Sequence, residues 1–442
     1  MKPVYIVSWL FALAISFVSC DDWLDKTPKD RLYPDVYFKT EDELRLFTNQ
    51  FYNNLVPSAV DIYSESSDLI VKSDLMLEMS GQRIIPDEGN GWNFTALRDI
   101  NFYLQYSHNC TEVNARNRYD GVARFFRAYF YFEKVKRYGD IPWYDKALDS
   151  DDPELYKARD SREFVMQKML EDLDFAIANL PKTKNAYVLT RWTALALKSR
   201  VCLFEGTFRK YHGLEDCEKY LNACVSASET FMNESGYTLY KSGSTPYRDL
   251  FASINLQADE VIFGRDYEAS LSVLHNVQNY ENSTTMGRPG MNKKIVNSYL
   301  MADGSRFTDK AGYETMTFDQ ECQNRDPRLA QTIRTPGYTR IGSTKKEAPN
   351  LAYTMTGYHL IKYSMTANYD ENNKSCNDIP LFRTAEVYLN FAEAKAELGT
   401  LKQADINKSI KLLRDRVGMT NLDMELANSK PDPYLMSAAT GY

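Results

Sequence analysis

The chain has little of what catalytic and metal-binding motifs require. Its four histidines are isolated, and none lies in an HExxH motif or beside a GxSxG nucleophile motif. Its seven cysteines contain no CxxC pair and no metal-ligand spacing with histidine, so the usual zinc and redox signatures are missing. Two carboxylates would suffice for a glycosidase, yet the sequence singles out no pair among 60 acidic residues. We therefore expect a protein that is not an enzyme.

Blocks of lysine or arginine are also missing, and the net charge is −7 at pH 7. This balance argues against nucleic acid and against an anionic lipid surface as partners. The chain also lacks an apolar run long enough for a membrane-spanning helix, which needs about 20 residues. Its longest candidate, Val4–Val18, is about 15 residues long and follows Lys2, a pattern that predicts a secretory signal.

Cys20 ends this leader and precedes the acidic residues Asp21 and Asp22. The small residues Val18 and Ser19 before it suit a lipoprotein peptidase, which predicts a signal peptide over residues 1–19 and a mature chain over 20–442. Cys20 would then carry a diacylglyceryl thioether and an amide-linked acyl chain, and more than one chain makes such an anchor stable. The alternative is an ordinary signal peptide with an unrelated cysteine.

Aromatic residues are abundant, with 31 Tyr, 22 Phe and 5 Trp. A tyrosine has a flat apolar face and a polar tip, which suits sugar ligands, although most of these rings are expected in a helical core. The six cysteines after Cys20 leave two interpretations open. One is a Cys202–Cys217 bridge, and the other is a set of buried free thiols.

Apolar periodicity predicts helices that pack as antiparallel pairs, and Thr40 with Glu43 forms a capping box at the first one. Glycines at the ends of the apolar patterns are expected to stop several of these helices. The expected helices are 40–55, 96–116, 122–138, 160–180, 190–205, 214–231, 381–398 and 406–417, with the stops at Gly139, Gly206, Gly399 and Gly418.

Helix pairs of this length resemble TPR arrays. The helical pattern fades over 234–378, where Gly, Pro, Asn and Ser accumulate around short β-like segments. The sequence therefore predicts a mostly α protein in which a TPR-like helical-hairpin scaffold (20–233 and 379–442) carries a large irregular α+β insertion (234–378). We expect the insertion to contain a ligand site, because sites are commonly placed on loops.

Several segments, in order along the chain, resemble the SusD/RagB family of Bacteroidetes outer-membrane nutrient-binding lipoproteins. They include the mature start, the Leu97–Leu104 stretch and the blocks Arg124–Pro142, Ala194–Val201, Ser298–Gly304 and Pro380–Ala394. The resemblance implies a SusD-like fold and a surface protein that binds oligosaccharides without cleaving them and caps a TonB-dependent, SusC-like transporter. Asp21 and Asp22 are similar to the surface-export signal of this phylum. Family members usually continue past Val417 into an RRERR-x-EL-like segment that this sequence does not contain, which predicts a truncated C-terminal part.

Trp92 is the first candidate ligand contact, because it lies between glycine and asparagine in the loop 89–93. An indole in such a loop can stack on a pyranose face, and the alternative is a buried ring. Asn101 can exchange hydrogen bonds with sugar hydroxyls, or it can brace a helix. Arg83 can form a fork to hydroxyls or to an acidic substituent, and a surface salt bridge is the alternative.

The resemblance places further ligand contacts in the loop before Asp303-Gly304, where this chain has Asn276, Asn279 and Tyr280. No cofactor is expected. The oxygen-rich run Asp149, Asp151, Asp152 and Glu154 is a calcium candidate, but it lacks the spacing of a calcium loop and is better interpreted as a solvated turn.

The leading interpretation is therefore a lipid-anchored protein on the extracellular side of the outer membrane that binds oligosaccharides and delivers them to a transporter. A peptide-binding member of the same family and a TPR-type scaffold that binds only protein are the alternatives. A ligand-binding protein predicts aromatic and amide side chains around a cleft, and a scaffold predicts a long apolar patch.

Overall fold

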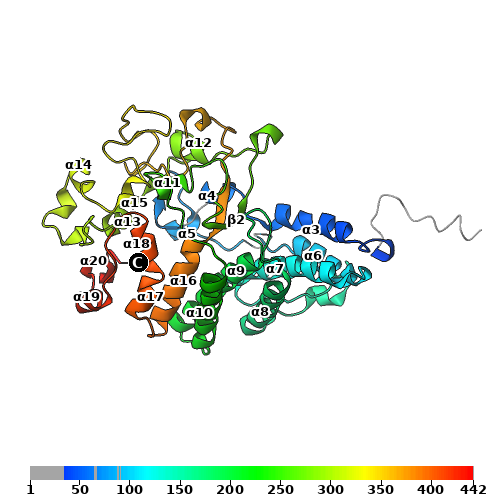
Figure 1. Ribbon diagram of the computed structural model, residues 1–442. Coiled ribbons are helices and arrows are strands. Elements are labelled where there is room, and N and C mark those ends of the chain that lie inside the picture. The colour runs from blue at the N-terminus through cyan, green and yellow to red at the C-terminus, as the bar shows by residue number, and fades with distance from the viewer. Residues whose placement is uncertain (1–33, 64–66, 87–88, 90, 442) are drawn as a thin grey trace, which may run out of the picture.

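The computed structural model describes residues 34–63, 67–86, 89 and 91–441, so the predicted signal peptide and Cys20 lie outside the described residues. The regular structure is mainly helical (Figure 1), which confirms the mostly α prediction. The strands of the described part form two short antiparallel pairs, β1 (Ile70–Val71) with β3 (Gly290–Met291) and β2 (Val261–Arg265) with β4 (Ile379–Arg383). No helix in the described part combines the length and the apolar character needed to cross a membrane.

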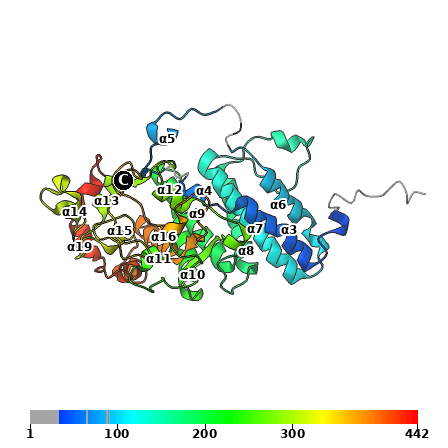
Figure 2. The same cartoon turned by 90° about the horizontal axis from the view of Figure 1, so that it is seen from above.

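Long helices pack as neighbours along the chain, α7 on α8 and α9 on α10, and α16 returns to pack on α10. The long helices are α3 (Glu41–Leu55), α6 (Thr95–Tyr106), α7 (Val113–Tyr138), α8 (Arg162–Asn179), α9 (Arg191–Tyr211), α10 (Cys217–Glu234) and α16 (Thr384–Glu397). Seen from above, α3, α6 and α7 lie at one end of the molecule and the short elements of the insertion at the other (Figure 2).

The remaining helices are short. They are α4 (Val60–Tyr63), α5 (Leu77–Ser80), α11 (Pro246–Asp249), α12 (Val277–Asn282), α13 (Lys293–Ser298), α14 (Phe318–Glu321), α15 (Pro327–Ala330), α17 (Gln403–Asn407), α18 (Ile410–Asp415), α19 (Met424–Ser429) and α20 (Pro433–Met436). Five of them, α11 to α15, lie within 234–378, where the sequence predicted irregular structure.

Helix α7 is the centre of the main core. Phe125, Phe126, Tyr131 and Phe132 lie on different faces of this helix, and all are buried. A helix that is apolar on most sides needs neighbours around it, and here α3, α6 and α8 all pack against α7.

The capping chemistry predicted for the first helix is confirmed. Thr40 accepts a hydrogen bond from the Glu43 amide at 3.3 Å, and the Glu43 carboxylate accepts one from the Thr40 amide at 3.0 Å. Gly139 follows the last residue of α7 with φ of 71°, in the positive-φ region that glycine adopts without strain.

The single helix predicted over 96–116 is wrong. Helix α6 ends at Tyr106 and α7 begins at Val113, since a tertiary contact fixes the connection between them. The Asn109 side-chain amide donates to the carbonyl oxygens of Pro34 at 2.7 Å and Tyr37 at 3.3 Å. These partners lie far away in the sequence, so local periodicity did not reveal the break.

The predicted stop at Gly206 is also wrong, because α9 continues to Tyr211. A Cβ atom on Gly206 would lie only 2.7 Å from Cγ of Leu221 on α10. The glycine therefore permits the close approach of two helices instead of ending one.

Two predicted helices near the end of the chain, 381–398 and 406–417, differ from the structure. Residues Leu381–Arg383 belong to β4, which pairs with β2, and the helix starts at Thr384. The predicted helix 406–417 is divided between α17 and α18. At the break, the Ser409 hydroxyl donates to the Asp405 carbonyl oxygen at 2.6 Å, a local bond that competes with regular helix geometry.

All six cysteines in the described part are free thiols. The Cys202–Cys217 bridge is therefore wrong, and the free-thiol interpretation is confirmed. Cys202 is buried, and burial raises the pKa of its thiol to about 12. A buried thiol of this kind behaves as a small apolar side chain.

Candidate functional site

Trp92 lines a hollow of about 370 Å³ that is also lined by residues of α6. Its indole is 40% exposed and is held edge-on between the rings of Phe94 at 5.3 Å and Tyr138 at 4.9 Å. The Arg159 guanidinium lies 5.0 Å from the centre of the Trp92 ring. Trp92 is thus neither a core residue nor a free side chain, because its neighbours fix an indole that remains partly open to solvent.

The rest of this hollow is mainly apolar with a few polar groups. Phe94, Leu97, Tyr144, Leu148 and Leu155 form the apolar lining, and Thr95, Arg98, Asn101 and Lys146 supply the polar groups. Concave apolar surfaces with a small number of directional polar groups are typical of small-ligand sites.

The Asn101 side chain supports one wall of the Trp92 hollow. Its amide nitrogen donates to the carbonyl oxygens of Tyr144 at 2.8 Å and Lys146 at 3.3 Å, and its oxygen accepts from Arg127 at 3.2 Å. The residue is only 1% exposed. These bonds favour the bracing alternative for Asn101, which orders the residues that line the hollow.

The second predicted group lies elsewhere, on α12 in the insertion. Tyr280 is buried and lines a separate hollow of about 450 Å³, with its ring 5.5 Å from that of Tyr63. The Asn276 side chain accepts from the Asn373 amide, and the Asn279 amide donates to the Asp370 carbonyl oxygen at 2.7 Å. These two asparagines attach α12 to the loop 370–373.

The predicted site residues are therefore only partly brought together. Trp92 and Asn101 line one hollow and Tyr280 lines another. Arg83 is exposed beside Glu78, with 3.6 Å between its Nε and the carboxylate, an arrangement that favours the surface salt-bridge alternative.

Glu281, next to Tyr280, is a buried titratable group that no sequence pattern indicated. Its carboxylate accepts hydrogen bonds from the Ser364 hydroxyl at 2.8 Å and the Tyr363 amide at 3.1 Å. Burial nevertheless outweighs these bonds and raises the pKa of Glu281 to about 7.

The acidic run after Tyr144 forms a turn held by local bonds. Asp152 accepts from the Glu154 amide at 2.9 Å, and Lys146 pairs with Glu154 at 2.9 Å. Within the residues that the structure describes, no cluster of three or more His, Cys, Asp or Glu side chains could hold a metal ion.

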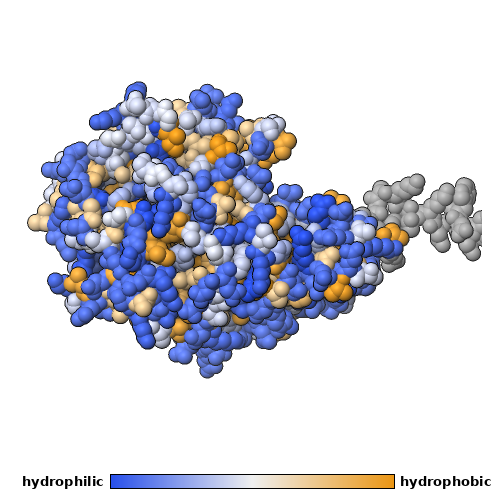
Figure 3. All heavy atoms as spheres, viewed as in Figure 1, coloured by the Kyte–Doolittle hydropathy of each residue, from blue (hydrophilic) through white to orange (hydrophobic). Residues whose placement is uncertain are grey.

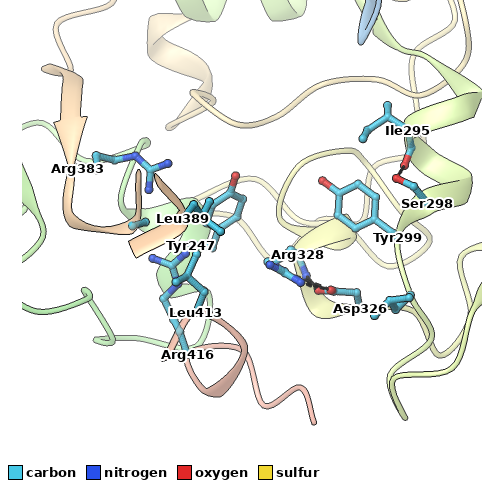
Figure 4. A pocket seen from close by; sticks show the side chains of 12 residues that line it. Tyr247, Ile295, Ser298, Tyr299, Asp326, Arg328, Arg383, Leu389, Leu413 and Arg416 are labelled. Carbon is cyan, nitrogen blue, oxygen red and sulfur yellow. Dashed lines mark hydrogen bonds and ion pairs between the residues drawn. The ribbon is translucent and has the colours of Figure 1, made fainter. Parts of the chain in front are cut away.

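A third hollow, of about 470 Å³, lies between α16, α18 and the insertion (Figure 4). Tyr247 and Tyr299 face it from opposite sides, and Arg383 and Arg416 lie beside Tyr247. Because these residues come from distant parts of the chain, the sequence alone did not reveal the site.

Two family models match most of this chain between them. One is described as the SusD family and matches residues 250–438, and the other is described as starch-binding associating with outer membrane and matches residues 82–191. The chain belongs to the SusD/RagB family. Trp92 and Asn101 lie in the part matched by the starch-binding description, and Tyr280 lies in the part matched by the SusD description.

Several similar proteins are SusD-like as well. SusD-like protein P2 of Formosa agariphila is 25% identical over 445 residues, which cover 94% of this chain and 82% of the relative. A solved SusD-like protein of Bacteroides fragilis has a TM-score of 0.73 at 22% identity, covering 92% of this SusD-family chain and 84% of its own. A solved SusD-like carbohydrate binding protein of the same species has a TM-score of 0.71 at 18% identity, covering 87% and 80%. At these identities the two structures establish the fold.

Proposed function

We propose that this protein binds oligosaccharides at the Trp92 hollow. The observation that carries the proposal is the partly exposed indole, held by neighbouring rings at the mouth of a small apolar concavity. An aromatic ring can pack against the C–H groups of a pyranose while nearby polar groups bind its hydroxyls. The starch-binding description of the matching family model and the carbohydrate-binding relative support this ligand class.

The polar groups around the Trp92 hollow suit a neutral or weakly charged sugar. Arg98 donates to the Leu148 carbonyl oxygen at 3.1 Å, so its side chain is ordered beside the hollow. Lys146 is paired with Glu154, which offsets its charge. The hollow thus presents hydrogen-bond donors whose charges are partly offset, since the Arg98 guanidinium also lies 3.8 Å from the Asp149 carboxylate.

The proposed cellular role is capture of a glycan at the extracellular side of the outer membrane and its transfer to a TonB-dependent, SusC-like transporter. The family description associates such proteins with the outer membrane. Cys20, at the end of an apolar leader, would supply the lipid anchor. The proposed role is binding without hydrolysis.

The protein-scaffold alternative predicts a long apolar patch. On the face drawn in Figure 3, apolar residues occur as small separate patches on a mainly hydrophilic surface. That pattern is ordinary for a protein surface, so it gives no support to an extended protein-docking face there.

Trp92→Ala tests the proposal directly. The truncation should weaken binding to the glycans that a glycan array identifies by about tenfold to a hundredfold, the effect of losing roughly 1 to 3 kcal/mol. Thermal stability should change little, since a partly exposed indole contributes less than a core one. Tyr156→Ala, which removes another exposed ring close to the hollow but outside its lining, is the matched control. Calorimetry with ligand and thermal melting without it measure the two effects.

A large fall in melting temperature with unchanged affinity would show that Trp92 is structural. A protein that retains no affinity for any glycan on the array but binds peptides would instead favour the peptide-binding alternative.

A further inference from the structure

The Tyr247–Tyr299 hollow has the features of a second ligand site. Tyr247 lies on α11 and Tyr299 follows α13, and Figure 4 shows their rings on opposite sides of the open space. The hollow of about 470 Å³ adjoins the Tyr280 hollow, because both are lined by Tyr247, Ile295 and Tyr299. Its volume lies within the range of about 300 to 1,000 Å³ that is usual for small-ligand pockets.

Positive charge exceeds negative charge around this hollow. Arg383 and Arg416 share a single carboxylate, that of Glu260, with contacts of 3.0 Å and 2.8 Å. Arg328 is neutralised by Asp326, as the dashed line in Figure 4 marks. One guanidinium charge at Glu260 is therefore left unbalanced.

Lys362 adds a second positive charge where the two hollows meet. Its ammonium lies 5.7 Å from the centre of the Tyr247 ring and 4.2 Å from that of Phe251. The cations near Tyr247 are thus Lys362, Arg383 and Arg416. The carboxylates nearby are Glu260, which pairs with both arginines, and Asp61 and Glu281, which line the adjoining hollow with Lys362.

The Tyr247 phenol responds to this charge. Burial alone would raise its pKa, yet Lys362, followed by Arg383 and Arg416, lowers it. Tyr299, across the hollow, shows the opposite behaviour, since burial raises the pKa of its phenol to about 12. The positive potential is therefore concentrated on the Tyr247 side of the hollow.

Arg416 also has donor capacity that the protein does not use. Its side chain is almost fully buried, and among the described residues its Nε has no hydrogen-bond acceptor. A buried guanidinium nitrogen without an acceptor leaves its charge incompletely compensated, so Arg416 adds to the positive potential beside the hollow.

We propose that this hollow binds an acidic sugar, a uronic acid residue of a glycan, separately from the Trp92 hollow. Its carboxylate would lie on the Tyr247 side, near Lys362, Arg383 and Arg416. Its ring would lie between Tyr247 and Tyr299, with its hydroxyls near the two phenol groups. The choice of a sugar over other carboxylates rests on the proposed glycan binding, whereas the choice of an anion rests on the charges alone.

An acidic peptide carries the same carboxylate and is the competing class of ligand. The apolar side of the hollow, Ala385, Leu389 and Leu413, would suit either ligand. Two phenol hydroxyls and the Ser298 hydroxyl in a concavity of this size favour a compact ligand with several hydroxyls.

The test uses the mature chain and two matched probes, trigalacturonate and neutral trigalactose, in titration calorimetry. In the Trp92→Ala background, which weakens the site suited to neutral sugars, trigalacturonate should bind at least tenfold more tightly than trigalactose, with an affinity that falls as salt is raised. Leu389 is 45% exposed at the hollow, so substitutions there should not unfold the protein. Leu389→Glu, which adds a like charge, should reduce trigalacturonate affinity at least tenfold, and Leu389→Gln should change it much less. Lys362→Met should reduce it as well.

Trp92→Ala separates the two sites. It should weaken binding at the Trp92 hollow by about tenfold to a hundredfold and leave trigalacturonate affinity unchanged, so either proposal can fail without the other. Equal affinities for the two probes in the Trp92→Ala background, or unchanged trigalacturonate binding in Leu389→Glu, would overturn the inference. The inference would also be overturned if trigalacturonate did not bind while a hexaglutamate peptide did, and if Leu389→Glu weakened the binding of that peptide.

Discussion

At the scale of single residues, the balance between burial and hydrogen bonding decides how charged groups behave in this protein. Glu281 accepts three hydrogen bonds from the Tyr363 amide and the Ser364 hydroxyl, yet burial raises its pKa to about 7. Asp172 is also buried, but it pairs with Arg127 at 2.7 Å. A guanidinium partner in direct contact is thus what distinguishes these two carboxyl groups.

The first stability prediction concerns Glu281→Gln. The folded-state pKa of about 7 lies above the ordinary glutamate pKa of 4.5, so the protonated group stabilises the fold below pH 4.5. That contribution is lost as the pH rises from 4.5 through 7, by about 3 kcal/mol in total. Glu281→Gln stays neutral and should remove this decline.

Urea unfolding at intervals from pH 5 to 8 measures the difference between the variant and the native chain. The free energy of unfolding of Glu281→Gln should rise relative to that of the native chain as the pH increases. Glu425→Gln, an exposed control, should give a flat difference. A flat difference for Glu281→Gln as well would contradict the prediction.

Two buried histidines act in the opposite direction. Burial lowers the pKa of His275 to about 4 and that of His359 to about 3, so both are neutral in the folded protein. Their stabilising contribution is present above the unfolded value of 6.5 and is lost as the pH falls toward 4. His275 hydrogen-bonds to the Asn377 carbonyl oxygen and His359 to that of Glu281, each at 2.8 Å. Acid should therefore loosen the packing around α12 first, which hydrogen exchange at pH 7 and pH 4.5 can measure.

At the scale of elements, one buried ion pair connects α7, α8 and α6. Arg127 on α7 forms two bonds to Asp172 on α8, at 2.7 and 2.8 Å, and also donates to Asn101 on α6. Arg127→Met should leave the Asp172 carboxylate buried and unpaired, at a cost of about 3 to 5 kcal/mol. Lys168→Met, which breaks an exposed pair with Glu171, should cost less than about 1 kcal/mol. Similar losses in denaturant unfolding for the two variants would rule out this role of Arg127.

Local chemistry made some elements predictable from sequence. The Thr40–Glu43 capping box and the glycine after α7 act over a few residues, and both occur where they were predicted. The break between α6 and α7 depends on Asn109 binding two distant carbonyl groups, and Gly206 is needed because Leu221 approaches it. Those partners are adjacent only in the folded chain.

The same distinction applies to the sites. The flanking glycine and asparagine suggested an accessible Trp92, and the indole is partly exposed. The Tyr247–Tyr299 hollow combines residues from α11 to the end of α18, and no local pattern links them. Tyr280 lies in the predicted loop region, but the other residues of its hollow could not be predicted because they come from distant segments, including α4, β1, α11, α13 and residues after 330.

At the scale of the whole molecule, the two proposed sites lie toward different ends. The Trp92 hollow belongs to the end formed by α3, α6 and α7, and the Tyr247–Tyr299 hollow lies among α13, α15, α16 and α18 (Figures 1 and 2). The first described residues, Pro34–Val36, also lie at the α3 end. A lipid anchor at Cys20 would therefore tether the protein by the end that carries the Trp92 hollow.

The anchor is tested by Cys20→Ala. The thioether and amide-linked chains can form only on this cysteine, and each buried CH₂ of an acyl chain contributes about 0.8 kcal/mol to membrane binding. The variant should therefore leave the membrane fraction or accumulate as unprocessed precursor. Cys217→Ala, which alters a free thiol on α10, should remain anchored like the native protein. Fractionation after carbonate and salt washing, followed by mass spectrometry of the N-terminus, measures both outcomes. A Cys20→Ala protein that has lost its leader and still stays in the membrane fraction at the native level would show that the attachment has another origin.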